Sequence, residues 1–296
     1  MVELQLAGGD FISDVSLLQD EAAQRLRGSQ ALPSHTTLYR FLAGADLGRV
    51  SKPTAVNRDM MRRAWAMGAA PAPGILTIEP DPTYVDAYGK HKEGSKFSYK
   101  GIVQMSPLVG VVGETGDVLA VRARGGNASP RRRLASFIDE CVAAIPVEAR
   151  ADYQLWIRID SAGSSNKVVE VATGHSAVFS ITCVQDKSVR RAIEALATDP
   201  KTVWESAKEA DGELAGSEVA ESTYRFAKRD LRLIVRRQRK AAGEQLFFDD
   251  LGGWRFFAMI TNLPPVFASA VDIDRHHRLR GGAPKEAICQ LKRSSG

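Results

Sequence analysis

The sequence lacks the features that mark a membrane protein or an exported, disulfide-bonded one. It has no run of about 18 or more uncharged apolar residues, so no membrane-spanning helix is predicted. The N-terminal stretch MVELQLAGGDFISD is acidic and broken by two glycines, and it does not have the pattern of a signal peptide. The three cysteines are isolated, without metal-ligand spacing, which predicts free thiols in a reducing cytosol. They are Cys141, Cys183 and Cys289.

Two common catalytic patterns are also missing. The glycine pairs in GGD, GGN and GGW lack the lysine and the strand–helix context of a phosphate-binding loop. No Ser-His-Asp order stands out, and there are no internal repeats. These absences argue against a nucleotide hydrolase built on a phosphate-binding loop and against a serine hydrolase.

What is present fits a globular protein with a substantial core. The chain has 296 residues, of which 44% are hydrophobic, and this is enough for one large domain or two smaller ones. The net charge of +5 and the isoelectric point near 9.1 permit a nucleic-acid partner without requiring one.

The texture of the sequence changes along the chain and predicts four regions. Residues 1–70 read as a helical N-terminal region, and GAAPAPG at 68–74 reads as a linker. Residues 71–199 alternate short apolar strands with helices, which favours a mixed α/β sheet flanked by helices. Residues 200–262 read as an antiparallel β insert, and residues 263–296 as a C-terminal helical segment.

Several element boundaries are predicted more closely. Residues 10–28 and 58–68 are expected to be helices, and Ser34 is expected to cap a helix that follows it. A helix over 130–144 is expected to have Pro130 in its first turn. The segment EQLFFDD, residues 244–250, is expected to be a strand of the insert.

Two predicted strands end in an aspartate. TIEPD ends at Asp81 and WIRID ends at Asp160, while Glu79 lies on the same face of its strand as Asp81. Carboxylates that converge at one sheet edge repel each other unless a cation lies between them, and hard oxygen ligands suit Mg²⁺ or Mn²⁺. The alternative is that each aspartate solvates a strand end or caps the next helix.

The order of segments resembles that of bacterial insertion-sequence transposases with a DDE catalytic domain. The segments are GGDFISDVSLL, LPSHTTLYRFL, LTIEPDPTYVDAYGKHKEG, YKGIVQMSPLVGVVGETGDVLAVRARGGNASP, RIDSAGSS, LIVRRQR, AMITNL and HHRLRGGAPKEAICQLK. The resemblance spans nearly the whole chain. It implies a ribonuclease-H-like core with a β insert before the third catalytic acid. It further implies that Asp81 and Asp160 are the first two catalytic, metal-binding acids.

The third acid implied by the resemblance is a glutamate in the terminal helix, and Glu286 is the candidate for both catalysis and metal binding. Counting back from Ile288 and Lys292 places the family's glutamate at Lys285, one residue earlier. One residue is about 100° of helix rotation. Glu286 is alternatively explained as an acid near the positive start of a helix opened by Pro284.

Other departures from the family pattern point toward a truncated or decaying copy. Glu79 stands where the family usually has Asp, Pro80 is unusual for a central strand, and Gly281-Gly282 interrupts a helical segment. The family also extends further at both ends than this sequence does.

Basic residues near the third acid are candidates for DNA contact. They would bind phosphates with salt-sensitive, sequence-independent affinity, although single basic runs are usually solvated faces. The candidates are Arg236, Arg237, Arg239, Arg278, Arg280 and Lys292. His276 and His277 lack a third His or Cys nearby and are not expected to be metal ligands. Trp254 and Phe256 are expected in the core rather than stacked on flipped bases.

The expected function is a transposase that cuts DNA at element ends and transfers the strand to target DNA with two Mg²⁺ or Mn²⁺ ions. The resemblance implies paired protomers, a homodimer acting on both DNA partners in the bacterial cytoplasm near the nucleoid. The alternatives are an inactive remnant that only binds DNA, and a metal-dependent nuclease unrelated to transposition. They differ in whether Asp81 and Asp160 bind metal and whether strand transfer occurs.

Overall fold

The protein is described from a computed structural model of the full chain. The structure describes residues 11–19, 25, 32–44, 47–87, 93–98, 101–209, 212–240 and 253–281. Within these residues, every helix is too short or too polar to cross a membrane.

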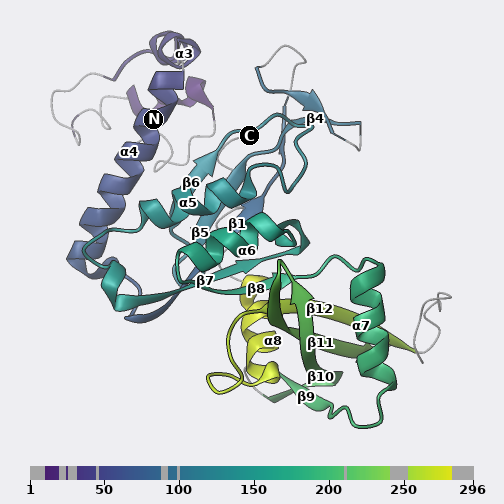
Figure 1. Cartoon of the computed structure of the whole chain (residues 1–296). Helices are drawn as coiled ribbons and strands as arrows, with labels where there is room; N and C mark the ends of the chain where they lie inside the picture. Colours follow the sequence, from purple (N-terminus) through teal and green to yellow (C-terminus); the bar gives the residue numbers. More distant parts are fainter. Residues whose placement is uncertain are drawn as a thin grey trace.

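The centre of the molecule is one mixed sheet of nine strands in the order β6-β5-β1-β7-β8-β12-β11-β10-β9 (Figure 1). Its strands are β1 (Gly74–Pro82), β5 (Leu108–Val112), β6 (Val118–Arg122), β7 (Tyr153–Ile159), β8 (Val178–Thr182), β9 (Glu205–Glu209), β10 (Gly212–Phe226), β11 (Arg229–Arg239) and β12 (Trp254–Thr261). The predicted α/β class with a mixed sheet is therefore confirmed.

The first five strands of the sheet have the ribonuclease-H-like arrangement. β6, β5 and β1 form an antiparallel meander, and β7 and β8 then join β1 in parallel through helical crossovers. Because β1 and β7 run in the same direction and are direct neighbours, their carboxyl ends meet at one edge of the sheet. The fold thus brings together the two strands that were predicted to end in an aspartate.

The β-rich stretch extends this sheet instead of forming a separate one. β12 pairs antiparallel with β8, with Thr261 opposite Ser180, and β11, β10 and β9 follow as an antiparallel meander. These strands lie within the range predicted for the insert, although the division into four regions stays a prediction. The predicted strand at 244–250 lies outside the described residues.

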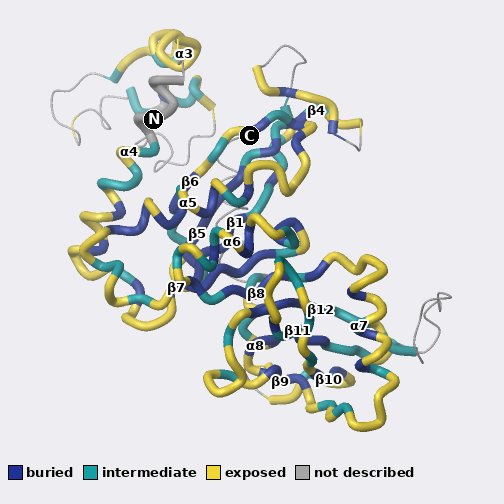
Figure 2. Tube along the Cα trace, viewed as in Figure 1, coloured by how far each residue is buried: buried dark blue, intermediate teal, exposed yellow. Residues whose placement is uncertain are grey.

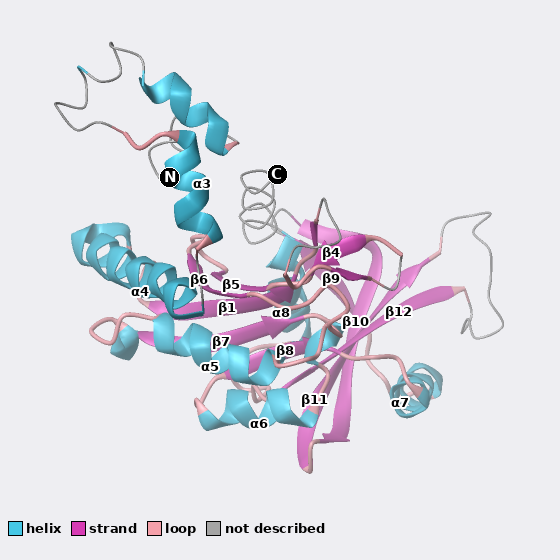
Figure 3. Ribbon diagram, turned by 90° about the horizontal axis from the view of Figure 1, so that it is seen from above, coloured by secondary structure: helices cyan, strands magenta, loops and turns pink. Residues whose placement is uncertain are grey.

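The helices cover the two faces of the sheet unequally. α5 (Leu134–Ala144), α6 (Asn166–Gly174) and α7 (Lys187–Thr198) lie on one face, and α8 (Ala270–Arg278) lies on the other, as Figure 3 shows. Residues from α5, α6 and α7 share one large apolar cluster with alternate residues of the sheet, whereas α8 belongs to a second, smaller cluster. The darkest part of the trace in Figure 2 runs through the strands between these layers.

The apolar cluster follows from the alternation of side chains along the strands. Leu76 and Ile78 of β1 and Ile157 of β7 are completely buried beneath Phe137 of α5. Phe179 of β8 continues the same layer. Since successive residues of a strand point to opposite faces, the residues between them face α8.

A smaller three-stranded sheet lies beside the main one. Its strands are β2 (Val85–Asp86), β3 (Lys96–Phe97) and β4 (Val103–Met105), in the order β2-β4-β3. It belongs to the loop that joins β1 to β5.

The described residues of the N-terminal region include helices, which differ in detail from the expected ones. Residues Ile12–Gln19 form a 3-10 helix (η1) in place of the expected α-helix. α3 (His35–Ala43) begins after Ser34, whose hydroxyl accepts a hydrogen bond from the Thr37 amide at 3.2 Å, so the predicted cap is confirmed.

Two predicted helix starts are wrong. The helix expected at 58–68 is the end of a longer helix, α4 (Leu47–Ala64), which continues as a π-turn (η2, Trp65–Ala69) and ends where Gly68 adopts a φ of 98°. α5 begins at Leu134, so Pro130 precedes the helix and is not in its first turn. Arg133 adopts a φ of 61° immediately before it, which turns the chain into the helix.

Candidate active site at the ends of β1 and β7

The first predicted acid, Asp81, lies near the end of β1, where the strand loses one neighbour. β1 pairs with β5 as far as Pro82, but its parallel ladder with β7 ends at Ile78 opposite Ile157. At Pro80 the strand is therefore paired on one side only, as an edge strand is, and a proline without an amide proton is tolerated there. This explains the unusual Pro80, and the separation of the strands opens space between their ends.

The second predicted acid, Asp160, directly follows β7. Asp81 and Asp160 each lie three residues beyond the last pair of that ladder, Ile78 and Ile157. The Asp160 Oδ1 atom accepts a hydrogen bond from the Ala162 amide at 2.8 Å and caps the 3-10 helix η4 (Ser161–Gly163). The capping alternative is thus confirmed for one oxygen of Asp160, while its Oδ2 atom makes a different contact, described below.

The two aspartates line one pocket of about 500 Å³. Its walls come from the β1 end, the loop before α5 and the turn after β7. The lining residues are Asp81, Pro82, Tyr84, Ser129, Pro130, Arg131, Asp160, Ser161, Ala162 and Arg280. Both carboxylates are partly open to solvent, with side-chain exposures of 28% for Asp81 and 35% for Asp160.

Arg280 joins these two carboxylates. It lies in η5 (Leu279–Gly281), the turn that follows α8, and its Nη2 atom forms an ion pair with Asp81. The same Nη2 atom lies 3.5 Å from Asp160 Oδ2. The space between the two acids therefore holds a cationic group of the protein itself.

Glu79 is not part of this open cluster, although it lies on the same face of β1 as Asp81. Its side chain is 3% exposed and forms an ion pair with Arg158 of β7, which is equally buried. Burial raises the pKa of the Glu79 carboxyl, and the guanidinium of Arg158 offsets part of that rise. Glu79 is thus a structural partner of Arg158 in this fold.

The adjacent histidines pack between α8 and the sheet. His277 exchanges hydrogen bonds of 2.9 Å with the hydroxyls of Ser180 and Thr182 on β8. The ring of His276 lies 4.2 Å from the ring of Trp156 on β7. Burial lowers the pKa of His276 to about 4 and that of His277 to about 3, so both rings are neutral at pH 7.

The arginines predicted to contact DNA all have partners within the protein. Arg236 pairs with the buried Asp274 at 3.2 Å and lies over the ring of Phe257. Arg237 is held between the rings of Trp204 and Trp254, 4.0 and 4.4 Å from its guanidinium carbon. Burial lowers the pKa of the Arg236 guanidinium.

The remaining arginine candidates differ in how open they are. Arg278, the last residue of α8, pairs with Asp274 of the same helix at 2.9 Å and with Glu209 of β9 at 3.3 Å. Arg239 is exposed at the end of β11 and its guanidinium carbon lies 5.1 Å from the Trp254 ring. The DNA-contact assignments stay predictions, and Arg239 is the most accessible of the set in the described structure.

The third acid cannot be placed in this site. Glu286 and Lys292 lie outside the described residues. Among the residues that the structure describes, no group of three or more His, Cys, Asp or Glu side chains is arranged to hold a metal ion. In the described part of the site, the two carboxylates are paired with one guanidinium, that of Arg280.

Sequence reasoning missed three residues of this region. Tyr84 and Arg131 line the pocket, and Arg158 connects β1, β7 and α8. Arg131 belongs to the basic run 131–133, but nothing in the run itself indicates which arginine faces the pocket. The signal for Arg158 was a charged residue inside the apolar run LWIRI, since a buried charge requires a partner.

Comparison with known proteins gives one family and one structural likeness of note. The cryo-EM structure of the piggyBac transposase synaptic complex with hairpin DNA is similar over 98% of this chain, with 10% identity and a TM-score of 0.43. This chain spans 57% of the length of that protein. No match was found among curated proteins.

The family described as transposase DDE domain group 1 matches residues 4–291, which is nearly the whole sequence. The match includes both strand-end aspartates and the strands of the predicted insert. The chain therefore belongs to the DDE transposases of group 1.

Proposed function

We propose that the protein is an insertion-sequence transposase that cuts DNA at element ends and joins the freed 3′-hydroxyl to target DNA. The observation that carries this proposal is the juxtaposition of Asp81 and Asp160 at neighbouring strand ends in one pocket. Membership of the DDE family gives that pair its chemical meaning. The substrates, element ends and target DNA, and the homodimeric active complex belong to the same proposal.

The residues at the pocket fit a divalent cation. Asp81 and Asp160 supply hard carboxylate oxygens, and the position between them already holds the guanidinium of Arg280 as a cationic stand-in. Asp81 and Asp160 would hold Mg²⁺ or Mn²⁺, with Glu286 as the proposed third ligand. Two such ions supply activation of an attacking oxygen and stabilisation of a leaving oxygen in phosphodiester chemistry.

The chain's own residues prepare the pocket for a phosphodiester. The turn after β7 is held by the hydrogen bond from the Ala162 amide to Asp160, which orients that carboxylate. Arg131 and Arg280 bring positive charge to the pocket lining, where a DNA phosphate would lie. Arg124, which is 9% exposed, donates hydrogen bonds to the Ser129 and Arg132 carbonyls and fixes the loop that carries Arg131.

One observation favours the alternative, a remnant that binds DNA without cutting it. Arg280 is paired with both aspartates, so any metal must compete with a cation that the chain supplies. In a remnant that has lost the third acid, this ion pair would persist, and the basic surface would still bind phosphates.

The test is calorimetric titration of the purified protein with Mn²⁺, compared with Asp81→Asn, Asp160→Asn and Asp139→Asn. Asp139 is a partly exposed acid of α5 that pairs with His175, and it serves as the control. We expect saturable Mn²⁺ binding that both pocket variants lose and the control keeps. Nicking of supercoiled plasmid DNA should fall by about 10³-fold or more in the pocket variants, because metal stabilisation contributes several kcal/mol.

Three results would contradict the proposal. If the folded wild-type protein binds no Mn²⁺ but still binds duplex DNA, the DNA-binding remnant is supported. If Mn²⁺ binding survives in both pocket variants, the metal site lies elsewhere. Nicking that depends on both aspartates but produces no strand transfer would support a nuclease instead of a transposase.

A further inference from the structure

A layer of polar side chains separates α8 from the sheet, directly beneath the pocket. On β1, Thr77 and Glu79 precede Asp81 on the same face, and on β7, Trp156 and Arg158 precede Asp160. Ser180 and Thr182 continue the layer on β8, and His276 and His277 complete it from α8. These eight residues, called the polar layer below, are Thr77, Glu79, Trp156, Arg158, Ser180, Thr182, His276 and His277.

Arg158 of β7 contacts residues of both β1 and α8. Its Nε atom donates to Glu79 Oε1 of β1 at 2.6 Å, and its Nη2 atom donates to the same oxygen. Its Nη1 atom donates to the backbone carbonyl of His276 at 2.5 Å. One guanidinium therefore ties together β1, β7 and the last turn of α8.

The side chains of Arg158 and Glu79 are closely packed by their surroundings. A Cβ atom added to Gly113, in the turn after β5, would lie 3.0 Å from Arg158 Nη2 and 3.2 Å from Glu79 Oε1. The side chains of Arg158 and Glu79 are each 3% exposed, so water does not loosen the pair. A buried ion pair of this kind is weak evidence for stability, since desolvation of both charges offsets the attraction. Its value lies in orientation, because the planar guanidinium fork accepts few alternative geometries.

We propose that Arg158 is a positioning residue for the pocket: by holding β1 and the end of α8 to β7, it sets Asp81, Asp160 and Arg280 in register. Asp81 lies two residues after Glu79, Asp160 two residues after Arg158, and Arg280 four residues after His276. A shift of the Arg158 guanidinium would therefore reach Asp81, Asp160 and Arg280 across only two to four residues of chain.

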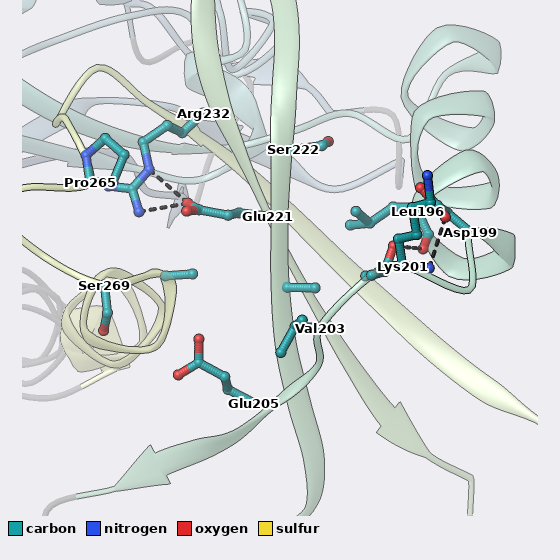
Figure 4. Close-up of a pocket in the computed structure, with 13 residues that line it drawn as sticks. Leu196, Asp199, Lys201, Val203, Glu205, Glu221, Ser222, Arg232, Pro265 and Ser269 are labelled. Carbon is teal, nitrogen blue, oxygen red and sulfur yellow. Dashed lines mark hydrogen bonds and ion pairs between the residues drawn. The ribbon is translucent and has the colours of Figure 1, made fainter.

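The chain offers a matched control at the other end of α8. Arg232 of β11 has a side chain that is 12% exposed, and it forms an ion pair of 2.6 Å with Glu221. It donates to the carbonyls of Leu263 and Ala268, which precede α8, at 2.8 and 3.0 Å. Figure 4 shows Arg232 and Glu221 joined beside Pro265 and Ser269, in a second pocket. None of the residues that line this pocket also lines the pocket of Asp81 and Asp160. Arg232 thus anchors α8 with the same chemistry, away from the site.

The experiment compares Arg158→Met, Arg158→Lys and Arg232→Met with the wild-type protein. Hydrogen exchange of the metal-free proteins is measured first, because it does not depend on catalysis. We expect Arg158→Met to speed exchange by about tenfold or more at 276–281 and at 160–163. Arg232→Met should speed exchange at 263–270 and leave 160–163 at the wild-type rate.

Mn²⁺ affinity is the second measurement, and this part rests on the proposed function. Loss of a group that orients metal ligands typically lowers metal affinity by about 10–100-fold, which we expect for Arg158→Met. Arg158→Lys should also bind Mn²⁺ more weakly, since an ammonium cannot reproduce the fork. Arg232→Met should bind Mn²⁺ like the wild type, even if its melting temperature falls as far as that of Arg158→Met.

The proposal is overturned if Arg158→Met leaves exchange at 160–163 unchanged, or if both methionine variants lose Mn²⁺ affinity to the same extent. Wild-type behaviour of Arg158→Lys would overturn the role of the fork. If the wild-type protein binds no Mn²⁺, the proposed function fails, and the exchange pattern still decides whether Arg158 positions the pocket.

Discussion

The two faces of β1, β7 and β8 carry different chemistry on the same backbone. One face presents residues such as Leu76, Ile157 and Phe179 to α5 and α6, and these side chains are almost completely buried. The other presents the polar layer to α8, with hydrogen bonds to nearly every member. Hydrophobic burial is non-directional and tolerates small shifts, whereas hydrogen bonds between buried groups require fixed geometry.

The two faces contribute differently to the stability of the fold and to the geometry of the site. The apolar face supplies the larger part of the hydrophobic stabilisation, because it buries most of the large apolar side chains. The polar layer contributes less net free energy, but it determines how α8 and its following turn meet the strand ends that carry Asp81 and Asp160. The pocket lies at the margin of the polar face.

The largest expected effect is the response of the polar layer to acid. His277 is buried and neutral, with Arg158, Arg236, Arg280 and His276 as the surrounding groups that oppose its protonation. Its pKa of about 3 in the folded protein lies below the ordinary 6.5. Between these two pH values the unfolded chain therefore binds a proton that the folded chain does not bind. The stabilisation is complete above pH 6.5 and is lost as the pH falls toward 4 and below.

The measurement is urea unfolding of the wild type and of His277→Gln at pH 7 and pH 4. The difference between the two proteins should change by roughly 3 kcal/mol in favour of the variant at pH 4. Parallel loss of stability in both proteins would show that His277 does not carry this acid sensitivity. Carboxylate titration contributes equally to both curves and cancels in the difference.

An intermediate effect is expected on the apolar face from Gly110→Ala. A Cβ atom at this position of β5 would lie 2.2 Å from Cys141 Sγ of α5, which requires α5 or the side chain to move. We expect a loss of about 1–3 kcal/mol in the free energy of unfolding. The double variant Gly110→Ala with Cys141→Ala should recover part of this loss, because the overlapping sulfur is gone.

Gly174→Ala is the control for that pair, since a Cβ atom at the end of α6 meets no other atom within 4 Å. Thermal or urea unfolding of the four proteins measures the effect. Mn²⁺ affinity should stay near the wild-type value in all of them, because the change lies on the face away from the pocket. A loss of Mn²⁺ affinity in Gly110→Ala would contradict the conclusion that a change on the apolar face leaves the pocket unaffected.

The smallest expected effect is at the margin of the polar face, in Arg280→Gln. Removing a cation that contacts both Asp81 and Asp160 should strengthen Mn²⁺ binding by about 3–10-fold, since the metal no longer competes with it. The effect is modest because the three side chains are partly exposed and solvent screens their charges. Arg275→Gln, an exposed arginine of α8, is the control.

Calorimetric titration with Mn²⁺ measures this change directly. Unchanged or weaker binding in Arg280→Gln would show that Arg280 supports the carboxylates instead of competing with the metal.

Much of the architecture could be read from the sequence because it depends on local patterns. Apolar runs predicted β1, β7 and β8, and the change of texture near residue 200 predicted the strands β10, β11 and β12. The Ser34 cap followed from one side chain and one nearby amide. The start of α5 was missed because the left-handed backbone of Arg133, which delays the helix, has no signal in the residue type.

The site was predicted in part for the same reason. Asp81 and Asp160 end apolar strands, which is a local feature, and parallel pairing then brings them together. The partners of Arg158, Arg237 and Arg280 come from distant parts of the chain, so no spacing rule could name them. The role of Glu79 was likewise decided by Arg158, across the strand pair.

The sequence by itself determined the mixed α/β class, the two strand-end aspartates and the resemblance to DDE transposases, because these rest on alternation, strand length and motif order. Only the tertiary structure decided which charges are buried together, that one guanidinium joins β1, β7 and α8, and that Arg280 lies between the acids. The physical reason is that hydrophobic patterning acts through neighbours along the chain, whereas a buried charge finds its partner across the fold.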